Sequence, residues 1–216
     1  DIPTSYSLEK YSTVASQQGN SCTGFAVANG AMSILYNIVN DITFANRKFV
    51  NRFDPYYVYN AIKNSDELDC IQNSECRCPT NIYEALDVVE TFGCKKWFLN
   101  PSQDCSVSYD YRNLKANTYI TGSYNIDGYV NLFEYRIYNG EHQTRVSIDE
   151  MKWAISNRNP IIAAITVDKE FSELNQNNVF YEATGGDPLG GHAVTIIGYD
   201  DNIGGGSFRI LNSYGR

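Results

Sequence analysis

NSCTGFAVANGAMSILY, residues 20–36, is the stretch whose pattern decides the fold. Its main apolar side chains recur at spacings of three and four, which places them on one face of a helix: Phe25, Ala28, Met32 and Leu35. Asn20 or Ser21 is a good N-cap for that helix. Glycine and alanine fill much of the rest, so other backbones can pack closely against it. We therefore expect a buried helix that begins at about Cys22.

The remaining pattern separates a helical first half from a β-rich second half. Capping signals predict three further helices: Asp54 with Pro55 to about Lys63, Thr80 to about Phe92 with Gly93 behind it, and Ile148–Ser156 with the capping box Ser147-x-x-Glu150. Runs of β-branched and aromatic residues predict strands at 118–121, 129–138, 161–167, 192–199 and 208–211. Segregated elements favour an α+β fold, with a helical lobe at about 12–112 and a β-rich lobe at 113–216.

Composition bounds the possible functions. The chain has 216 residues, enough for one large domain or two small lobes, and 43% are hydrophobic. The net charge is −8 and no cluster of Lys and Arg is found, which argues against a nucleic-acid partner. The longest apolar run, 160–167, is shorter than the roughly 18 residues that span a bilayer. Because the chain begins at Asp1 without Met, we expect a processed or trimmed form.

The six cysteines fall into two groups. Cys22 stands apart, and five others lie within 36 residues of one another: Cys70, Cys76, Cys78, Cys94 and Cys105. This group predicts one or two disulfides, which would place the protein in an oxidising, secreted or vesicular compartment. A zinc site using Cys70, Cys76 and Cys78 is the rival interpretation. The spacing lacks a repeated C-x₂-C pair, so we expect no metal.

Three polar residues stand out as candidates for catalysis. Of the two histidines, His142 lies in a polar stretch expected to be a solvated loop. His192 opens an apolar strand after two glycines, which would let a substrate approach the backbone. Cys22 lies at the first turn of its helix, where unpaired N–H groups and the macrodipole lower a thiol pKa. Asn212 follows another apolar strand, and its amide oxygen could orient an imidazole. Taken alone, each residue could equally be structural.

Together, these residues resemble the papain-like cysteine proteases. That family shows the chain order Cys, His, Asn, and its nucleophile region reads Gln-Gly-x-Cys-Gly-Ser-Cys-Trp-Ala-Phe-Ser. Here residues 18–26 read QGNSCTGFA, which is most similar to a divergent branch with Ser-Cys-Val-Gly-Phe-Ala. His192-Ala193-Val194 with 197–199 is similar to the family's His-Ala-Val and Val-Gly-Tyr. Residues 212–215, NSYG, are similar to its Asn-Ser-Trp-Gly.

The resemblance implies a two-lobe fold, with a helical lobe, a β-barrel-like lobe and the active site in the cleft between them. It implies hydrolysis of peptide bonds through a thioester, without metal or cofactor. Cys22 would attack the carbonyl, His192 would act as base and acid, and Asn212 would orient His192. Gln17 or Gln18, with the Cys22 N–H, would form the oxyanion hole. The implied partners are a peptide or protein substrate and a pro-segment or protein inhibitor, with a secreted or lysosome-like location.

Departures from the family pattern leave alternatives open. The family places its Gln six residues before the nucleophile, whereas Gln17 and Gln18 are five and four residues before Cys22. An ungapped alignment on Gln18 puts Gly24 in the nucleophile position, which would make the chain an inactive homologue that binds peptide or a partner. Another acyl transferase is a third interpretation. Thr23 and Tyr214 replace the usual Trp pair, and the family continues beyond the motif that ends here near Arg216.

Overall fold

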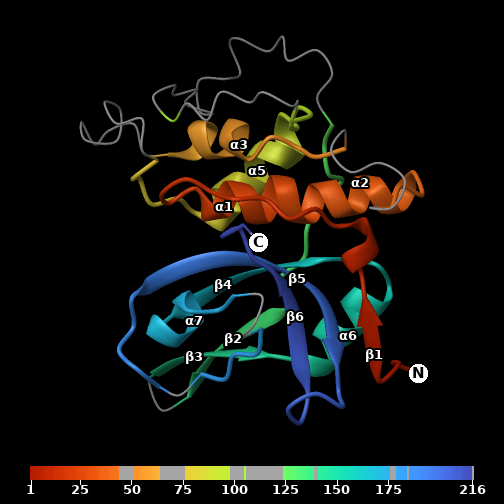
Figure 1. Cartoon of the computed structure of the whole chain (residues 1–216), viewed down its shortest axis with the longest axis vertical. Helices are drawn as coiled ribbons and strands as arrows, with labels where there is room; N and C mark the ends of the chain where they lie inside the picture. Colours follow the sequence, from red (N-terminus) through yellow and green to blue (C-terminus); the bar gives the residue numbers. More distant parts are fainter. Residues whose placement is uncertain are drawn as a thin grey trace.

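The computed structural model describes residues 1–43, 51–63, 76–97, 105, 124–138, 141–175, 179–183 and 185–215. Figure 1 shows a layer of helices stacked on an antiparallel sheet, and the C-terminal end of the chain lies where the two layers meet. The α+β fold with two lobes is confirmed. The predicted strand at 118–121 and the predicted lobe boundary at 112–113 lie outside the described residues.

One continuous helix lies along the boundary between the layers, on the side of the helices (Figure 1). It comprises α1 (Cys22–Gly24), a π-helical segment η2 (Phe25–Met32) and α2 (Ser33–Val39). It begins where the sequence predicted and extends three residues beyond the predicted end at Tyr36. The predicted N-cap is only partly right, because the Ser21 hydroxyl donates to Gln18 O (2.8 Å) and makes no cap bond to the helix.

A π-helix is rare, and side chains satisfy its backbone here. Ser33 Oγ donates to the carbonyl of Ala28 (2.8 Å), and Thr195 Oγ1 donates from the sheet to the carbonyl of Ala26 (2.9 Å). A Cβ at Gly30 would overlap Thr195 Oγ1 and lie 3.0 Å from its Cβ. Glycine at this position therefore lets the helix touch the strand that carries His192.

Three of the other helices are capped at or next to the residue that the sequence predicted. Helix α3 (Pro55–Ile62) begins after Asp54, whose carboxylate accepts from the backbone N–H groups of Tyr56 (2.9 Å) and Tyr57 (3.2 Å). Helix α6 (Ile148–Ser156) has the predicted Ser147 cap. Helix α5 (Ile82–Thr91) is capped by Asn81, so the predicted Thr80 cap is wrong by one residue. A single turn, α7 (Lys169–Ser172), was not predicted.

Strand β5 (Gly190–Asp200) organises the main sheet. Strand β6 (Ser207–Leu211) pairs with one edge of β5, while β4 (Ile161–Val167) and β1 (Ser5–Ser7) occupy successive parts of the other edge. A short 3-10 turn, η1 (Glu9–Tyr11), follows β1. Within the described residues this sheet is open rather than closed into the barrel-like form that was expected.

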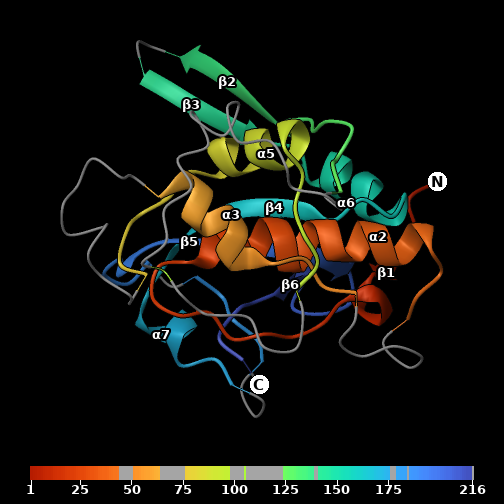
Figure 2. The same cartoon turned by 90° about the horizontal axis from the view of Figure 1, so that it is seen from above.

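A separate two-stranded ribbon projects beyond the main sheet (Figure 2). It consists of β2 (Phe133–Tyr138) and β3 (Glu141–Val146), and His142 pairs with Ile137 across it. The solvated loop predicted around His142 is therefore wrong. The predicted strand 129–138 begins only at Phe133. The polar composition of β3 concealed it, because a ribbon outside the core needs no apolar alternation.

Two apolar clusters make up much of the buried core. One lies among helices and includes Val27, Val58 and Val88, and the other joins α6, β1 and β5 through Ile155 and Ile197. By length and composition alone, helix Cys22–Val39 could cross a membrane. The sequence did not predict this, because alanine and glycine lie between the large apolar side chains of this helix and leave no long apolar run. The helix is 72% buried inside the protein, as the core helix of a folded domain is.

Candidate active site

Cys22 and His192 meet where the helix and β5 come together. Cys22 is the first residue of α1, and His192, 6% exposed, is the third residue of β5. The Cys22 sulfur and the His192 imidazole lie close enough to shift each other's pKa, through hydrogen bonding and through charge. The helix start and the strand start thus bring a thiol and an imidazole together from positions 170 residues apart in sequence.

The two groups shift each other's titration in opposite directions. Burial raises the pKa of Cys22, but hydrogen bonds from His192 and from the Ala193 backbone, with the His192 charge, outweigh burial and lower the pKa. Burial lowers the pKa of His192, whereas its bonds to Cys22 and Asn212 and the thiolate charge raise the pKa overall. Each group therefore favours the charged form of the other, which is the condition for a thiolate–imidazolium pair.

Asn212 fixes the orientation of the imidazole. His192 Nε2 lies 2.8 Å from Asn212 Oδ1. The backbone N–H of Ser213 also donates to Oδ1 (2.8 Å), which identifies that atom as the amide oxygen. An oxygen can only accept, so Nε2 carries the proton and the other ring nitrogen is left for Cys22. All three sequence candidates, Cys22, His192 and Asn212, are brought together.

An aromatic wall covers the imidazole. The Tyr214 ring stacks on His192 with centroids 4.9 Å apart and an interplanar angle of 25°. Phe171 contacts both rings edge-on, at 6.0 Å from His192 and 6.4 Å from Tyr214. Aromatic faces favour a cation beside them, so the stack on Tyr214 supports the imidazolium form. Tyr214 thus covers the imidazole where the family pattern has Trp.

The residues behind this wall were not predicted from the sequence. Asp168 is buried; it accepts from the Phe171 backbone N–H (2.9 Å) and from the Tyr181 hydroxyl (2.8 Å). It thereby caps α7 and ties Tyr181 to Phe171, whose rings meet edge to face at 5.3 Å. The only signal was an Asp in a capping position, and one helical turn is too short to show a 3.6-residue period.

The two candidate glutamines lie in the loop before Cys22. The Gln17 backbone N–H donates to Ser213 O (2.7 Å), and its side-chain oxygen accepts from the Ser213 hydroxyl. Its Nε2 donates to Gly19 O (2.6 Å), and an amide nitrogen has a second proton to give. Gln18 accepts the Ser21 hydroxyl at its backbone carbonyl. Gln17 is thus joined to the residue that follows Asn212.

Gly24 lies against the neighbouring helix. A Cβ at Gly24 would overlap the Pro55 carbonyl oxygen and lie 3.1 Å from the Pro55 carbon and 3.2 Å from Tyr59 N. Helix α3 therefore approaches the nucleophile helix here at a distance that only glycine allows. Gly24 serves the packing of α3, while the residue whose pKa is lowered by His192 is Cys22.

The cysteines divide as the sequence suggested. Cys22 and Cys94 are free, Cys76 is bonded to Cys105, and Cys78 is also disulfide-bonded. Because their sulfurs are used in disulfides, Cys76 and Cys78 cannot supply the thiolates of the alternative zinc site. Among the described residues, no group of His, Cys, Asp and Glu could hold a metal ion.

These lobes, with a cysteine at a helix start facing a strand histidine, define a papain-like fold. No family model and no curated protein matches the sequence. Three solved structures that match are xylellain, a cysteine protease from Xylella fastidiosa (21% identity, TM-score 0.60), proCathepsin B S9 from Trypanosoma congolense (14%, 0.54) and digestive procathepsin L 3 of Tenebrio molitor (16%, 0.62).

The matches cover the whole chain or nearly so. The aligned region spans 100%, 99% and 100% of this chain, and 76%, 68% and 61% of the three structures in the same order. At these identities the likeness shows the fold. The chemistry that the site can perform follows from Cys22, His192 and Asn212 and not from these matches.

Proposed function

We propose that this protein is a cysteine peptidase that hydrolyses peptide bonds through Cys22, His192 and Asn212. The observation that carries the proposal is the convergence of Cys22 and His192: His192 Nε2 is held 2.8 Å from Asn212 Oδ1, the Cys22 pKa is lowered by His192, and the His192 pKa is raised by Cys22. A thiol beside a base that is itself oriented by a third group is the arrangement used for nucleophilic acyl transfer. The papain-like fold of the solved cysteine proteases agrees with it.

The steps follow from the charges. The Cys22 thiolate attacks the carbonyl carbon of a peptide bond, and the negative charge moves to the carbonyl oxygen. Imidazolium His192 then gives its proton to the departing amine, which leaves a thioester on Cys22. His192, now neutral, takes a proton from water, and the resulting hydroxide attacks the thioester. The acid is released, and the thiolate–imidazolium pair is restored.

For the oxyanion, we propose the Cys22 backbone N–H and the side chain of Gln17 as donors. Gln17 is supported by its anchor on Ser213, because a donor held rigidly stabilises developing charge without reorganisation. Gln18 is the alternative. A substrate backbone could approach along Gly190 and Gly191, where an added Cβ would meet no atom within 4 Å.

The partners and compartment are also proposed. The substrate would be a peptide or protein, and a pro-segment or protein inhibitor would cover the site, as the names of the procathepsin structures suggest for those proteins. Disulfides persist in oxidising compartments, so the Cys76–Cys105 bond supports a secreted or vesicular location.

Alkylation tests the nucleophile. Iodoacetamide at neutral pH is expected to label Cys22 at least ~10-fold faster than Cys94, because the thiolate reacts and the buried Cys94 has a raised pKa. Peptide mass spectrometry would give the two rates. Cleavage of a mixed peptide library should fall in step with Cys22 labelling, and a Cys94→Ala variant should behave as the parent.

If complete labelling of Cys22 leaves cleavage intact, Cys22 is not the nucleophile. If Cys22 is reactive and no peptide in the library is cleaved, the peptide-binding alternative gains support.

The pH dependence follows from the two pKa directions. As pH falls through the lowered Cys22 pKa, the thiolate is protonated and hydrolysis slows. As pH rises through the raised His192 pKa, the proton for the leaving amine is lost and hydrolysis slows again. We therefore expect a bell-shaped plot of kcat/KM against pH, with its acid limb below the ordinary thiol pKa of about 8.5. A rate that only rises up to about pH 9 would indicate an unperturbed thiol.

A further inference from the structure

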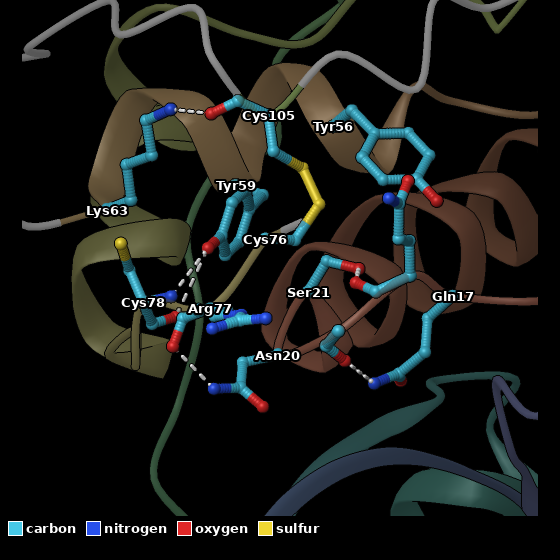
Figure 3. Close-up of a disulfide and its surroundings, with 12 residues drawn as sticks. Gln17, Asn20, Ser21, Tyr56, Tyr59, Lys63, Cys76, Arg77, Cys78 and Cys105 are labelled. Atoms are coloured by element: carbon cyan, nitrogen blue, oxygen red, sulfur yellow. Dashed lines mark hydrogen bonds between the residues drawn. A yellow bond between two sulfur atoms is a disulfide. The ribbon is translucent and has the colours of Figure 1, made fainter. Parts of the chain in front are cut away.

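The loop that presents Cys22 is fastened to a distant segment of the chain. Asn20, two residues before Cys22, donates its backbone N–H to Cys76 O (2.6 Å) and its side-chain Nδ2 to Arg77 O (2.6 Å). Figure 3 shows the Asn20 side chain directed at that segment. One residue thus binds two consecutive carbonyls, which fixes both its position and its rotation.

The segment that receives Asn20 is itself held to α3 (Figure 3). Cys76 is bonded to Cys105, and the carbonyl of Cys105 accepts from the Lys63 ammonium. The Tyr59 hydroxyl accepts from Cys78 N–H (3.0 Å) and donates to Cys78 O (3.3 Å). The two bonded cysteines are each 1% exposed. The disulfide therefore lies within a buried frame that supports the nucleophile loop.

The backbone at Cys76 depends on this frame. Its φ is 54°, in the left-handed region that residues other than glycine rarely adopt. Such a conformation persists where the surrounding bonds impose it. Without the bond to Cys105, Cys76 can relax to an ordinary conformation. Its carbonyl, and that of Arg77, would then no longer be presented to Asn20.

We propose that Asn20 and the Cys76–Cys105 disulfide are positioning groups for the Cys22 sulfur. The proposal rests on Cys22 being the nucleophile. Its consequence is that one chain needs a reduced thiol at Cys22 and an intact disulfide 54 residues further along at Cys76. The disulfide acts only through the loop, whereas the Asn20 carbonyl also accepts from the Cys22 sulfur (4.0 Å).

A dithiol reductant should therefore have two opposite effects. At low concentration it keeps the half-buried Cys22 as a thiol. At higher concentration its thiolate attacks the Cys76–Cys105 bond, two cysteine thiols form, and the reductant is oxidised to its own disulfide. Because this bond is buried, the second effect needs stronger reduction than the first. Cys22 reactivity should rise and then fall as the reductant concentration is increased.

Two variants test the positioning directly. Asn20→Leu keeps the approximate size of the side chain and removes the Nδ2 donor without adding a charge, and a Cys76→Ser/Cys105→Ser double variant removes the disulfide. The readouts are the rate of Cys22 alkylation by iodoacetamide, followed by peptide mass spectrometry, and its pH profile. We expect both variants to react about tenfold more slowly at neutral pH, since small displacements of reacting groups have effects of this size or larger. Their profiles should shift to higher pH.

Cys94→Ala is the matched control, because Cys94 is the other free cysteine among the described residues and lies outside this frame. Thermal unfolding of each variant separates misplacement from loss of the fold, and Asn20→Leu alone suffices if the double variant does not fold. Parent-like alkylation rates and pH profiles in the folded variants would overturn the proposal. Absence of peptide cleavage in the parent would instead count against the proposed function. The rate of Cys22 alkylation reports the position of the loop whether or not the protein cleaves peptides.

Discussion

Cys22→Ala is expected to lower kcat/KM for peptide cleavage by on the order of 10⁵-fold or more, because in the described part of the chain Cys22 is the thiol beside His192 that can form the thioester. The comparison requires a substrate cleaved by the parent protein and measurements at the pH optimum. The fold should persist, since Cys22 is only half-buried and alanine fits within the space of cysteine.

His192→Ala tests the same unit from the other side. It removes the base and the charge that lowers the Cys22 pKa, so the expected loss is of the same order. The two losses should not add in the double variant, because residues that act in one step fail together. Additive losses, or a Cys22→Ala variant that still cleaves at the parent rate, would remove the basis for the assigned chemistry.

Gly24→Ala is expected to have the largest effect on stability. The new methyl group would overlap the Pro55 carbonyl oxygen and crowd two further backbone atoms of α3, none of which can swing aside as a side chain can. Relief requires α3 to move away from the nucleophile helix, and overpacking of this kind costs about 3 kcal/mol. Urea denaturation would give the change in the free energy of unfolding.

Gly191→Ala is the matched control, because a Cβ there meets nothing within 4 Å and its φ is not left-handed. We expect a change in unfolding free energy within about 0.5 kcal/mol. Equal stabilities of the two variants would mean that the close approach of α3 at Gly24 does not govern packing.

Local signals predicted the elements that build the site. The apolar stripe and small residues of 20–36 gave the position of the nucleophile helix, and the Asp54-Pro55 and Ser147-x-x-Glu150 caps gave two helix starts that the structure confirms. The three apolar runs at 161–167, 192–199 and 208–211 became β4, β5 and β6. Each of these signals is short in range, so no knowledge of the fold is needed to read it.

Features that depend on contacts between distant residues were not predictable in the same way. The pairing of Cys76 with Cys105 is one of several that the spacing permits. The π-helical segment depends on a hydroxyl donated by Thr195 from the opposite layer. Phe171 reaches His192 from a single turn that has no periodic signal. In each case the partner lies in another element, and only the folded chain brings the two together.

The seam between Gly30 and Thr195 has a consequence for altering this protein. One hydroxyl and one absent methyl group set how far the sulfur-bearing helix stands from the imidazole-bearing strand. The projecting ribbon pairs with neither residue, so exchanging it would leave both in place. A larger residue 30 or a shorter side chain at residue 195 would change the distance between the helix and the strand. The reactivity of Cys22 and His192 would then change although both residues remain.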